Sequence, residues 1–163
     1  MKNTEIIQKK IYTLPELLFK LAQIRLTGSR VSFTNGVFDI LHSGHIASLS
    51  QAAAEADFLI VGVNSDASVK RLKGNDRPLN SEKERALLLA ALIIVDAVVI
   101  FEGDTPLELI KSIMPDVMVK GGDYTLDQIA GAKEVTANGG RVVINPIVEG
   151  FSTTGLIKKI QSL

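Results

Sequence analysis

The chain has 163 residues, of which 46% are hydrophobic and 5% aromatic, and 18 basic residues balance 18 acidic ones to give a formal net charge of zero. This composition excludes a disordered chain and argues against a protein that coats nucleic acid, which needs a basic surplus and stacking aromatic side chains. The absence of cysteine excludes a disulfide scaffold, a thiolate nucleophile and a cysteine-ligated zinc site. The length fits one domain over residues 1–163, and we expect residues 1–13 to form a loosely held arm.

No segment has the pattern of a targeting or membrane-spanning sequence. Residues 1–5 lack the apolar core of a signal peptide. The most apolar stretch, residues 86–101, is interrupted by Asp96 and is shorter than the ~20 residues that a membrane span requires. We therefore expect a soluble cytoplasmic protein with no membrane and no nucleic acid among its partners.

Segments with helical and strand patterns alternate along the chain. The predicted helices cover residues 14–26, 46–56, 82–93, 106–113, 127–138 and 154–161. The predicted strands cover residues 31–34, 58–63, 95–101, 117–119 and 141–144. Capping-box patterns at residues 81–84 and 105–108 mark two of the helix starts. This alternation predicts an α/β fold with a Rossmann-like, doubly wound parallel sheet.

Ligands of such sheets bind beyond the carboxyl ends of the strands. The loop after the first predicted strand holds both histidines of the chain, His42 and His45. If residues 43–45 begin the following helix, its first amide groups and its positive dipole end point at the same place as the two imidazoles. Gly36 and Gly44 let a phosphate approach the backbone closely. We therefore predict a site for a phosphate that gains negative charge during a reaction.

Two other interpretations of this loop stay open. A single histidine at such a turn commonly caps or packs against a helix, although two histidines around one glycine favour a functional site. The other alternative is a zinc site in which Asp39 joins the two imidazoles as the third ligand. A strand-end turn that opens a helix is better shaped for an anion than for zinc, so we assign no metal ligand.

A basic stretch follows the second predicted strand. The chain has no Lys or Arg over residues 34–66, so the charge that offsets a triphosphate has to come from elsewhere, and residues 70–78 are the nearest supply. Lys73 stands beside Gly74 in what we predict to be a mobile loop, and we assign this lysine to function. Its basic neighbours fit a solvated surface equally well.

Two later loops add candidate ligand groups. Gly121 and the glycine after it let a flat ligand lie on the backbone, and Asp123 can accept hydrogen bonds from amino or hydroxyl groups, although a plain turn explains two glycines as well. Before the last predicted helix, Ser152, Thr153 and Thr154 offer more hydroxyl groups than a helix cap needs. Together with free amide groups, these hydroxyls make a phosphate cradle.

Several of these motifs together resemble one family, the cytidylyltransferase-like nucleotidyltransferases, from about residue 14 to residue 160. Within that family the chain is most similar to the adenylyltransferases that act on D-glycero-β-D-manno-heptose 1-phosphate. The motifs that carry the resemblance are Asn35-Gly36-Val37-Phe38-Asp39, His42-Ser43-Gly44-His45, Arg71-Leu72-Lys73-Gly74, Arg77-Pro78, residues 116–124 (DVMVKGGDY), Ile129-Ala130-Gly131, Asn138-Gly139-Gly140 and Ser152-Thr153-Thr154.

The resemblance implies a reaction and its participants. Such enzymes transfer AMP from ATP, with Mg²⁺, to a heptose 1-phosphate and make ADP-heptose for lipopolysaccharide. The sugar-kinase domain that is often fused ahead of this domain is absent from the sequence, so we expect a separate kinase to supply the sugar 1-phosphate. The resemblance also implies a homodimer.

The resemblance further implies roles for individual residues. His42 and His45 would act on the reacting phosphate, and Lys73 on the triphosphate. The residues expected around the nucleotide are Gly36, Val37, Phe38, Asp39, Gly44, Asp66, Arg85, Gly121, Asp123, Ser152, Thr153 and Thr154.

Two departures from related patterns bear on the substrate. No arginine precedes the Ser-Thr-Thr motif, in contrast to the glycerol-3-phosphate cytidylyltransferases, which favours the adenylyl branch. Val37 stands where the heptose enzymes usually have cysteine. The alternatives are a glycerol-3-phosphate cytidylyltransferase, an adenylyltransferase for a cofactor precursor, and a nucleotide-binding module without catalysis.

Overall fold

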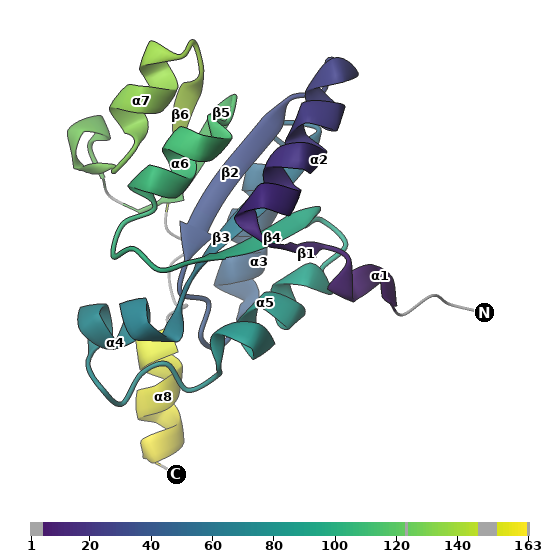
Figure 1. Ribbon diagram of the computed structural model, residues 1–163. Helices are drawn as coiled ribbons and strands as arrows, with labels where there is room; N and C mark the ends of the chain where they lie inside the picture. Colours follow the sequence, from purple (N-terminus) through teal and green to yellow (C-terminus); the bar gives the residue numbers. More distant parts are fainter. Residues whose placement is uncertain (1–4, 123, 147–152, 163) are drawn as a thin grey trace.

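The computed structural model describes residues 5–122, 124–146 and 153–162. In that part of the chain, six parallel strands form one sheet in the order β1-β4-β3-β2-β5-β6 (Figure 1). The strands are β1 Ile11–Tyr12, β2 Val31–Gly36, β3 Phe58–Asn64, β4 Ala97–Phe101, β5 Val117–Gly121 and β6 Arg141–Asn145. The predicted Rossmann-like, doubly wound α/β sheet is confirmed.

Helices connect the strands and cover both faces of the sheet. They are α1 Glu5–Gln8, α2 Leu14–Leu26, α3 Ser43–Ala53, α4 Asp66–Lys73, α5 Glu82–Ala90, α6 Leu107–Ile113, α7 Ala132–Ala137, α8 Thr153–Gln161 and the short 3₁₀ helix η1 Leu126–Gln128. Figure 1 shows α4 and α8 below the sheet, on the side toward which β2 points.

The sheet separates two apolar cores, one on each of its faces. The first core packs α2, α6 and α7 against one face, with Phe33 and Met118 at its centre. The second packs α3 and α5 against the other face, with Val61 and Val119 among its strand residues. Because successive side chains of a strand point to opposite faces, each central strand contributes alternate residues to each core. Such strands have no polar face, which explains their continuous apolar runs.

The order in which strands join the sheet reverses between β2 and β5, which are parallel neighbours. From β2 the sheet grows through β3 to β4, and the chain then returns past β2 to place β5 and β6 on its other side. β2 and β5 are paired at Phe33 and Met118, so their carboxyl ends lie side by side. A crevice forms at such a reversal because the two connecting segments leave in opposite directions.

Four local predictions are corrected by the structure. Residues 5–12 are not a loose arm, since they form α1 and β1, and β1 pairs with β4. The predicted basic loop contains α4, which Ser65 caps. The helix expected over 127–138 is divided into η1 and α7. The capping box at 81–84 is present, whereas α6 begins at Leu107 without a side-chain cap.

Candidate active site

The two histidines lie against each other at the start of α3. His42 is the N-cap residue and His45 lies in the first turn, so the helix begins where an anion site would require it. The two rings are stacked, with centroids 3.8 Å apart and planes 20° from parallel. Phe38 meets the His45 ring edge-on, with a centroid separation of 5.3 Å. The two imidazoles and the first turn of α3, which includes Gly44, therefore lie together at one place.

The surroundings of both imidazoles favour the uncharged form. Burial lowers the pKa of His42. The pKa of His45 is lowered to about 4 by burial, by the neighbouring His42 and by the positive charge of Lys73, against an opposing backbone interaction with Ile40. A neutral imidazole carries one N–H donor and one acceptor nitrogen, so each ring can donate one hydrogen bond.

A tight backbone turn carries the chain from β2 toward these rings. Phe38 adopts a left-handed conformation with φ of 52°. A Cβ at Gly36 would lie 3.0 Å from the Phe38 ring, which is closer than ordinary van der Waals contact. Gly36 therefore makes room for the aromatic ring that packs on His45, in addition to leaving the strand end open.

Asp39 is buried, and its carboxylate is bonded to neighbouring protein groups. Its carboxylate accepts hydrogen bonds from the backbone amides of Leu79 and Asn80 and is paired with Arg77 at 2.6 Å. Burial raises its pKa, but the bonds from Asn80, Leu79 and Arg77 outweigh burial and hold the pKa below its ordinary value. Asp39 thus fastens residues 77–80 beneath the β2–α3 turn, and its carboxylate is engaged there.

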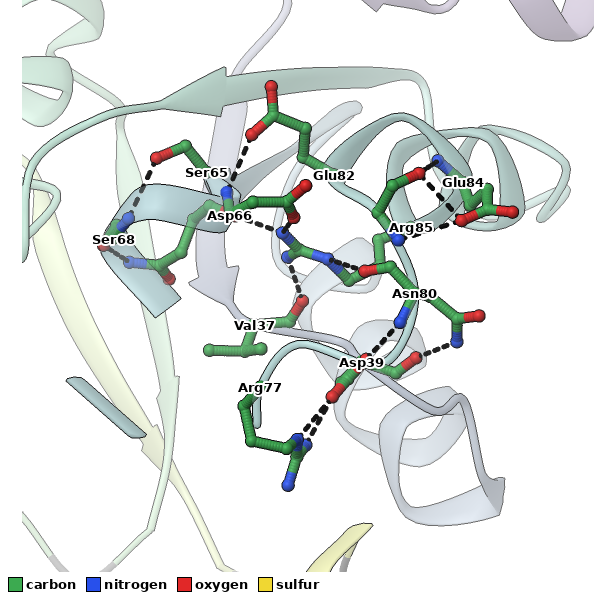
Figure 2. Close-up of polar contacts among 12 residues, drawn as sticks. Val37, Asp39, Ser65, Asp66, Ser68, Arg77, Asn80, Glu82, Glu84 and Arg85 are labelled. Atoms are coloured by element: carbon green, nitrogen blue, oxygen red, sulfur yellow. Dashed lines mark hydrogen bonds and ion pairs between the residues drawn. The ribbon is translucent and has the colours of Figure 1, made fainter. Parts of the chain in front are cut away.

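Arg85 is fully buried and joins four segments (Figure 2). Its guanidinium donates to the backbone carbonyls of Val37, Asn64 and Asn80 at 2.6, 2.7 and 3.0 Å, and to the Asp66 carboxylate at 2.8 Å. The resemblance implied that Arg85 and Asp66 lie near the nucleotide. In the structure the fully buried Arg85 holds the carboxyl ends of β2 and β3 together through the Val37 and Asn64 carbonyls.

Lys73 is brought to the strand ends by α4. It is close enough to His45 to lower the pKa of that ring. The helix is fixed by its own Arg71, which bonds to the Asp104 carboxylate and to the Glu102 carbonyl, both at 2.7 Å. Arg71 and Lys73, which the sequence analysis placed in one loop, therefore have different roles. Arg71 anchors α4, and Lys73 lies near the imidazoles.

The remaining predicted nucleotide residues are only partly described. Gly121 ends β5 next to α3, where a Cβ would lie 3.4 Å from the Ser48 hydroxyl. Thr153 begins α8. Asp123, Ser152 and the side chain of Thr154 lie outside the described residues.

Sequence reasoning missed a cavity of about 400 Å³ at the reversal between β2 and β5. Asn35, Asn64, Lys73 and Lys120 lie in its wall. The signal was present, since Asn35, Asn64 and Lys120 lie at the carboxyl ends of otherwise apolar strands. From the sequence, Lys120 was included only within the motif of residues 116–124. A larger hollow, about 740 Å³, is lined by residues of α1, β1 and α2 and lies away from the carboxyl ends of β2 and β5.

The described side chains do not form a metal site. No three His, Asp or Glu side chains among them lie where they could share an ion. Asp39, Asp66 and Asp104 each accept a hydrogen bond from an arginine. The donor set therefore does not fit a resident Mg²⁺, and we treat the ion as part of the MgATP substrate. None of the helices in the described segments is long and apolar enough to span a membrane.

Comparisons with known proteins agree on one family. The cytidylyltransferase-like family model matches residues 33–159. The chain is 54% identical to the bifunctional protein HldE of Koribacter versatilis over 158 residues and to that of Shigella sonnei over 151, covering 97% and 93% of this chain. It spans 32% of the length of each of these relatives.

Solved structures agree on the fold. A lipopolysaccharide core biosynthesis protein from Thermoplasma volcanium superposes with a TM-score of 0.60 at 29% identity, covering 74% of this chain and 98% of that one. Pantoate-beta-alanine ligase from Francisella tularensis superposes with a TM-score of 0.61 at 13% identity, covering 94% and 78% of the two chains, and at that identity shares the fold alone.

Proposed function

Because the chain belongs to the cytidylyltransferase-like family of nucleotidyltransferases, we propose that it transfers AMP from ATP to D-glycero-β-D-manno-heptose 1-phosphate, giving ADP-heptose and pyrophosphate. The observation that carries this proposal is the stacked pair of neutral imidazoles at the start of α3, with Lys73 beside them. The identity to bifunctional HldE proteins over nearly the whole chain supports the heptose substrate.

The reaction is an in-line displacement at the α-phosphorus of ATP. A phosphate oxygen of the sugar 1-phosphate attacks, the bond from the α-phosphorus to the bridging oxygen breaks, and pyrophosphate leaves with that electron pair. The attacking oxygen is already anionic near pH 7, so neither a general base nor a nucleophilic side chain is needed. Catalysis then depends on positioning and on stabilising the charge that develops on the phosphoryl oxygens.

The chain's own residues supply that stabilisation in this proposal. His42 and His45 each donate one N–H to an α-phosphate oxygen, and the first amide groups of α3 point the same way. Lys73 brings a positive charge to the triphosphate, and Thr153 offers a hydroxyl at the start of α8. Asp39 and Arg85 act as positioning residues, since they hold the turn that carries the imidazoles.

Pyrophosphate release tests the proposal directly. We expect release with ATP and the heptose 1-phosphate, and little or none with CTP and glycerol 3-phosphate. Release with only the second pair would make the chain a glycerol-3-phosphate cytidylyltransferase. ATP binding without release on any phosphorylated acceptor would make it a nucleotide-binding module.

Replacing one imidazole tests the assignment of the catalytic groups. We expect His45→Ala to lower turnover by about 10²–10³-fold, the usual cost of losing one preorganised donor, while ATP binding and the melting temperature change little. Gln51→Ala, on the exposed side of the same helix, serves as the matched control. An unchanged turnover in a folded His45→Ala protein would contradict the role.

The proposed reaction also implies partners. The acceptor requires a kinase that phosphorylates the anomeric hydroxyl of the sugar, and ATP as donor places the reaction in the cytoplasm. We infer a homodimer from the family resemblance. Leu87, Leu88 and Ile93 are exposed apolar residues on and after α5 that could meet a second copy. Light scattering of wild type and Ile93→Glu tests this, and a wild-type monomer would contradict it.

A further inference from the structure

Lys120 is a partly buried lysine that the reaction described above does not use. Its Nζ lies 3.3 Å from the Asn35 Oδ1 atom and 5.9 Å from the centre of the Tyr124 ring. Among the described residues, no carboxylate lies within ion-pair distance of it. Burial lowers the pKa of its ammonium group. A partly desolvated cation held by a neutral amide is costly unless a ligand supplies the opposite charge.

The alternation of the strands decides which side of the sheet Lys120 faces. Phe33 and Met118 are paired neighbours in the first core, and Asn35 and Lys120 come two residues later on the same two strands. They therefore project to the α6 and α7 side, whereas the imidazoles stand at the start of α3, on the opposite side. The two sets of groups meet only at the open strand ends.

The cavity around Lys120 has the size and lining of a site for a small polar molecule. Its volume of about 400 Å³ lies within the usual range of roughly 300–1,000 Å³ for small-molecule sites. Asn35, Asn64, Thr105 and Gln128 offer amide and hydroxyl groups that can bind sugar hydroxyls. The Tyr124 ring forms an apolar part of the wall.

The charges in the wall favour an anion. Lys73 and Lys120 both line the cavity, and the acidic residue described there is Asp104. Asp104 is already bonded to Arg71, whose guanidinium balances its charge. The two lysines thus leave an excess of positive charge, which suits a phosphorylated polyol better than an uncharged sugar.

We propose that this cavity is the acceptor subsite and that Lys120 is a specificity-determining residue, donating hydrogen bonds to a phosphate oxygen of the incoming sugar 1-phosphate. The proposal rests on the proposed function. Of its three N–H donors, one is used by Asn35, so two remain for the ligand. The acceptor then lies on the α6 and α7 side and ATP on the α3 side. Their phosphates meet between β2 and β5, where Gly36 and Gly121 leave the backbone open.

Lys120→Met tests the proposal because it keeps the length of the side chain and removes the charge. We expect the KM for the sugar 1-phosphate to rise about 10- to 100-fold, the usual weight of a charge-assisted hydrogen bond, while the KM for ATP changes less than twofold. Lys133→Met removes the same charge from the exposed surface of α7 and should change neither constant. Lys120→Gln is the second variant, in case Lys120→Met does not fold.

Calorimetric titration separates this proposal from the function on which it rests. Heptose 1-phosphate should bind wild type and the Lys133→Met protein, and bind Lys120→Met at least tenfold more weakly. If wild type binds the sugar phosphate in this way but releases no pyrophosphate, the proposed function fails and the anion subsite stands. The subsite proposal is overturned if Lys120→Met matches Lys133→Met, if it weakens ATP instead of the acceptor, or if wild type binds no sugar phosphate.

Discussion

His45 illustrates how the surroundings of one side chain set its chemistry. Burial, the adjacent His42 and the charge of Lys73 all disfavour a second positive charge at this position. The ring therefore stays neutral through the physiological range, and the site's fixed positive charge comes from lysine. Turnover should not be lost through titration of His45 between about pH 6 and pH 8.

Titration by NMR checks the charge state of His45. The chain has only two histidines, so their ring signals can be assigned by comparison with a His42→Gln protein. We expect His45 to remain neutral until the pH approaches 4. Because the unfolded ring binds its proton near pH 6.5, His45 should lower the free energy of unfolding as the pH falls from about 6.5 to 4. A midpoint near 6.5 in the folded protein would contradict this.

Arg85 is expected to contribute far more to stability than Arg71, whose side chain is about half exposed. We expect Arg85→Met to lower the free energy of unfolding by about 3–5 kcal/mol, because it leaves the Asp66 carboxylate and three carbonyls without their donor. Arg71→Met removes an exposed ion pair with Asp104 and should cost about 1 kcal/mol or less. Urea denaturation measures both, and equal costs would contradict the bracing role.

The division between η1 and α7 shows how one residue shapes a helical element. Gly131 has φ of 89°, a left-handed conformation, and a Cβ there would lie 2.6 Å from Ile110 of α6. A continuous helix over 127–138 would remove this turn and push the segment away from α6. Gly28, after α2, has φ of 75° but faces open space.

These two glycines form a matched pair for mutation. Gly28→Ala should cost about 1–2 kcal/mol, the price of a left-handed alanine. Gly131→Ala carries the same backbone cost and should add about 1–3 kcal/mol from the contact with Ile110. Thermal unfolding of both proteins gives the difference. If Gly131→Ala were no more destabilising than Gly28→Ala, the close packing of α7 on α6 would be wrong.

At the scale of the whole molecule, the amino-terminal edge of the sheet, which we expect to contribute to stability, lies apart from the candidate active site. β1 lies at one edge, next to β4, and the site lies at the reversal between β2 and β5. Lys10 fastens this edge, since its Nζ donates to the carbonyls of Leu92 and Val95 at 3.1 and 2.7 Å. The amino-terminal segment therefore closes the second core without reaching the imidazoles.

Removing residues 1–12 tests this separation. We expect the free energy of unfolding to fall by about 2–4 kcal/mol, from lost hydrogen bonds and apolar contacts, while the turnover of the folded protein stays within about twofold. The full-length Lys10→Met protein should show a smaller loss of the same kind. A large loss of turnover at full folding would mean that the amino-terminal edge supports the site.

The sequence by itself determined the alternation of strands and helices, the doubly wound sheet and the position of the histidine pair. These features depend on neighbours only a few residues apart, and His42 and His45 must share a helix turn once α3 begins at Ser43. The sequence also pointed to Lys73, because residues 34–66 hold no Lys or Arg and Lys73 stands beside Gly74 in the basic stretch that follows. The prediction of a loop over residues 70–78 was wrong in part, because Ser65 caps a helix there and Gly74, assigned to the loop, ends it.

Only the tertiary structure decided which groups face one another across the sheet. Arg85 reaches Val37 across 48 residues, and Lys120 reaches Asn35 across 85. Such contacts depend on where the chain places β5 after β4, and the local pattern of apolar residues does not predict that position. The structure therefore gave Asp39 and Arg85 protein partners, and brought Lys120 into a cavity that no single motif predicts.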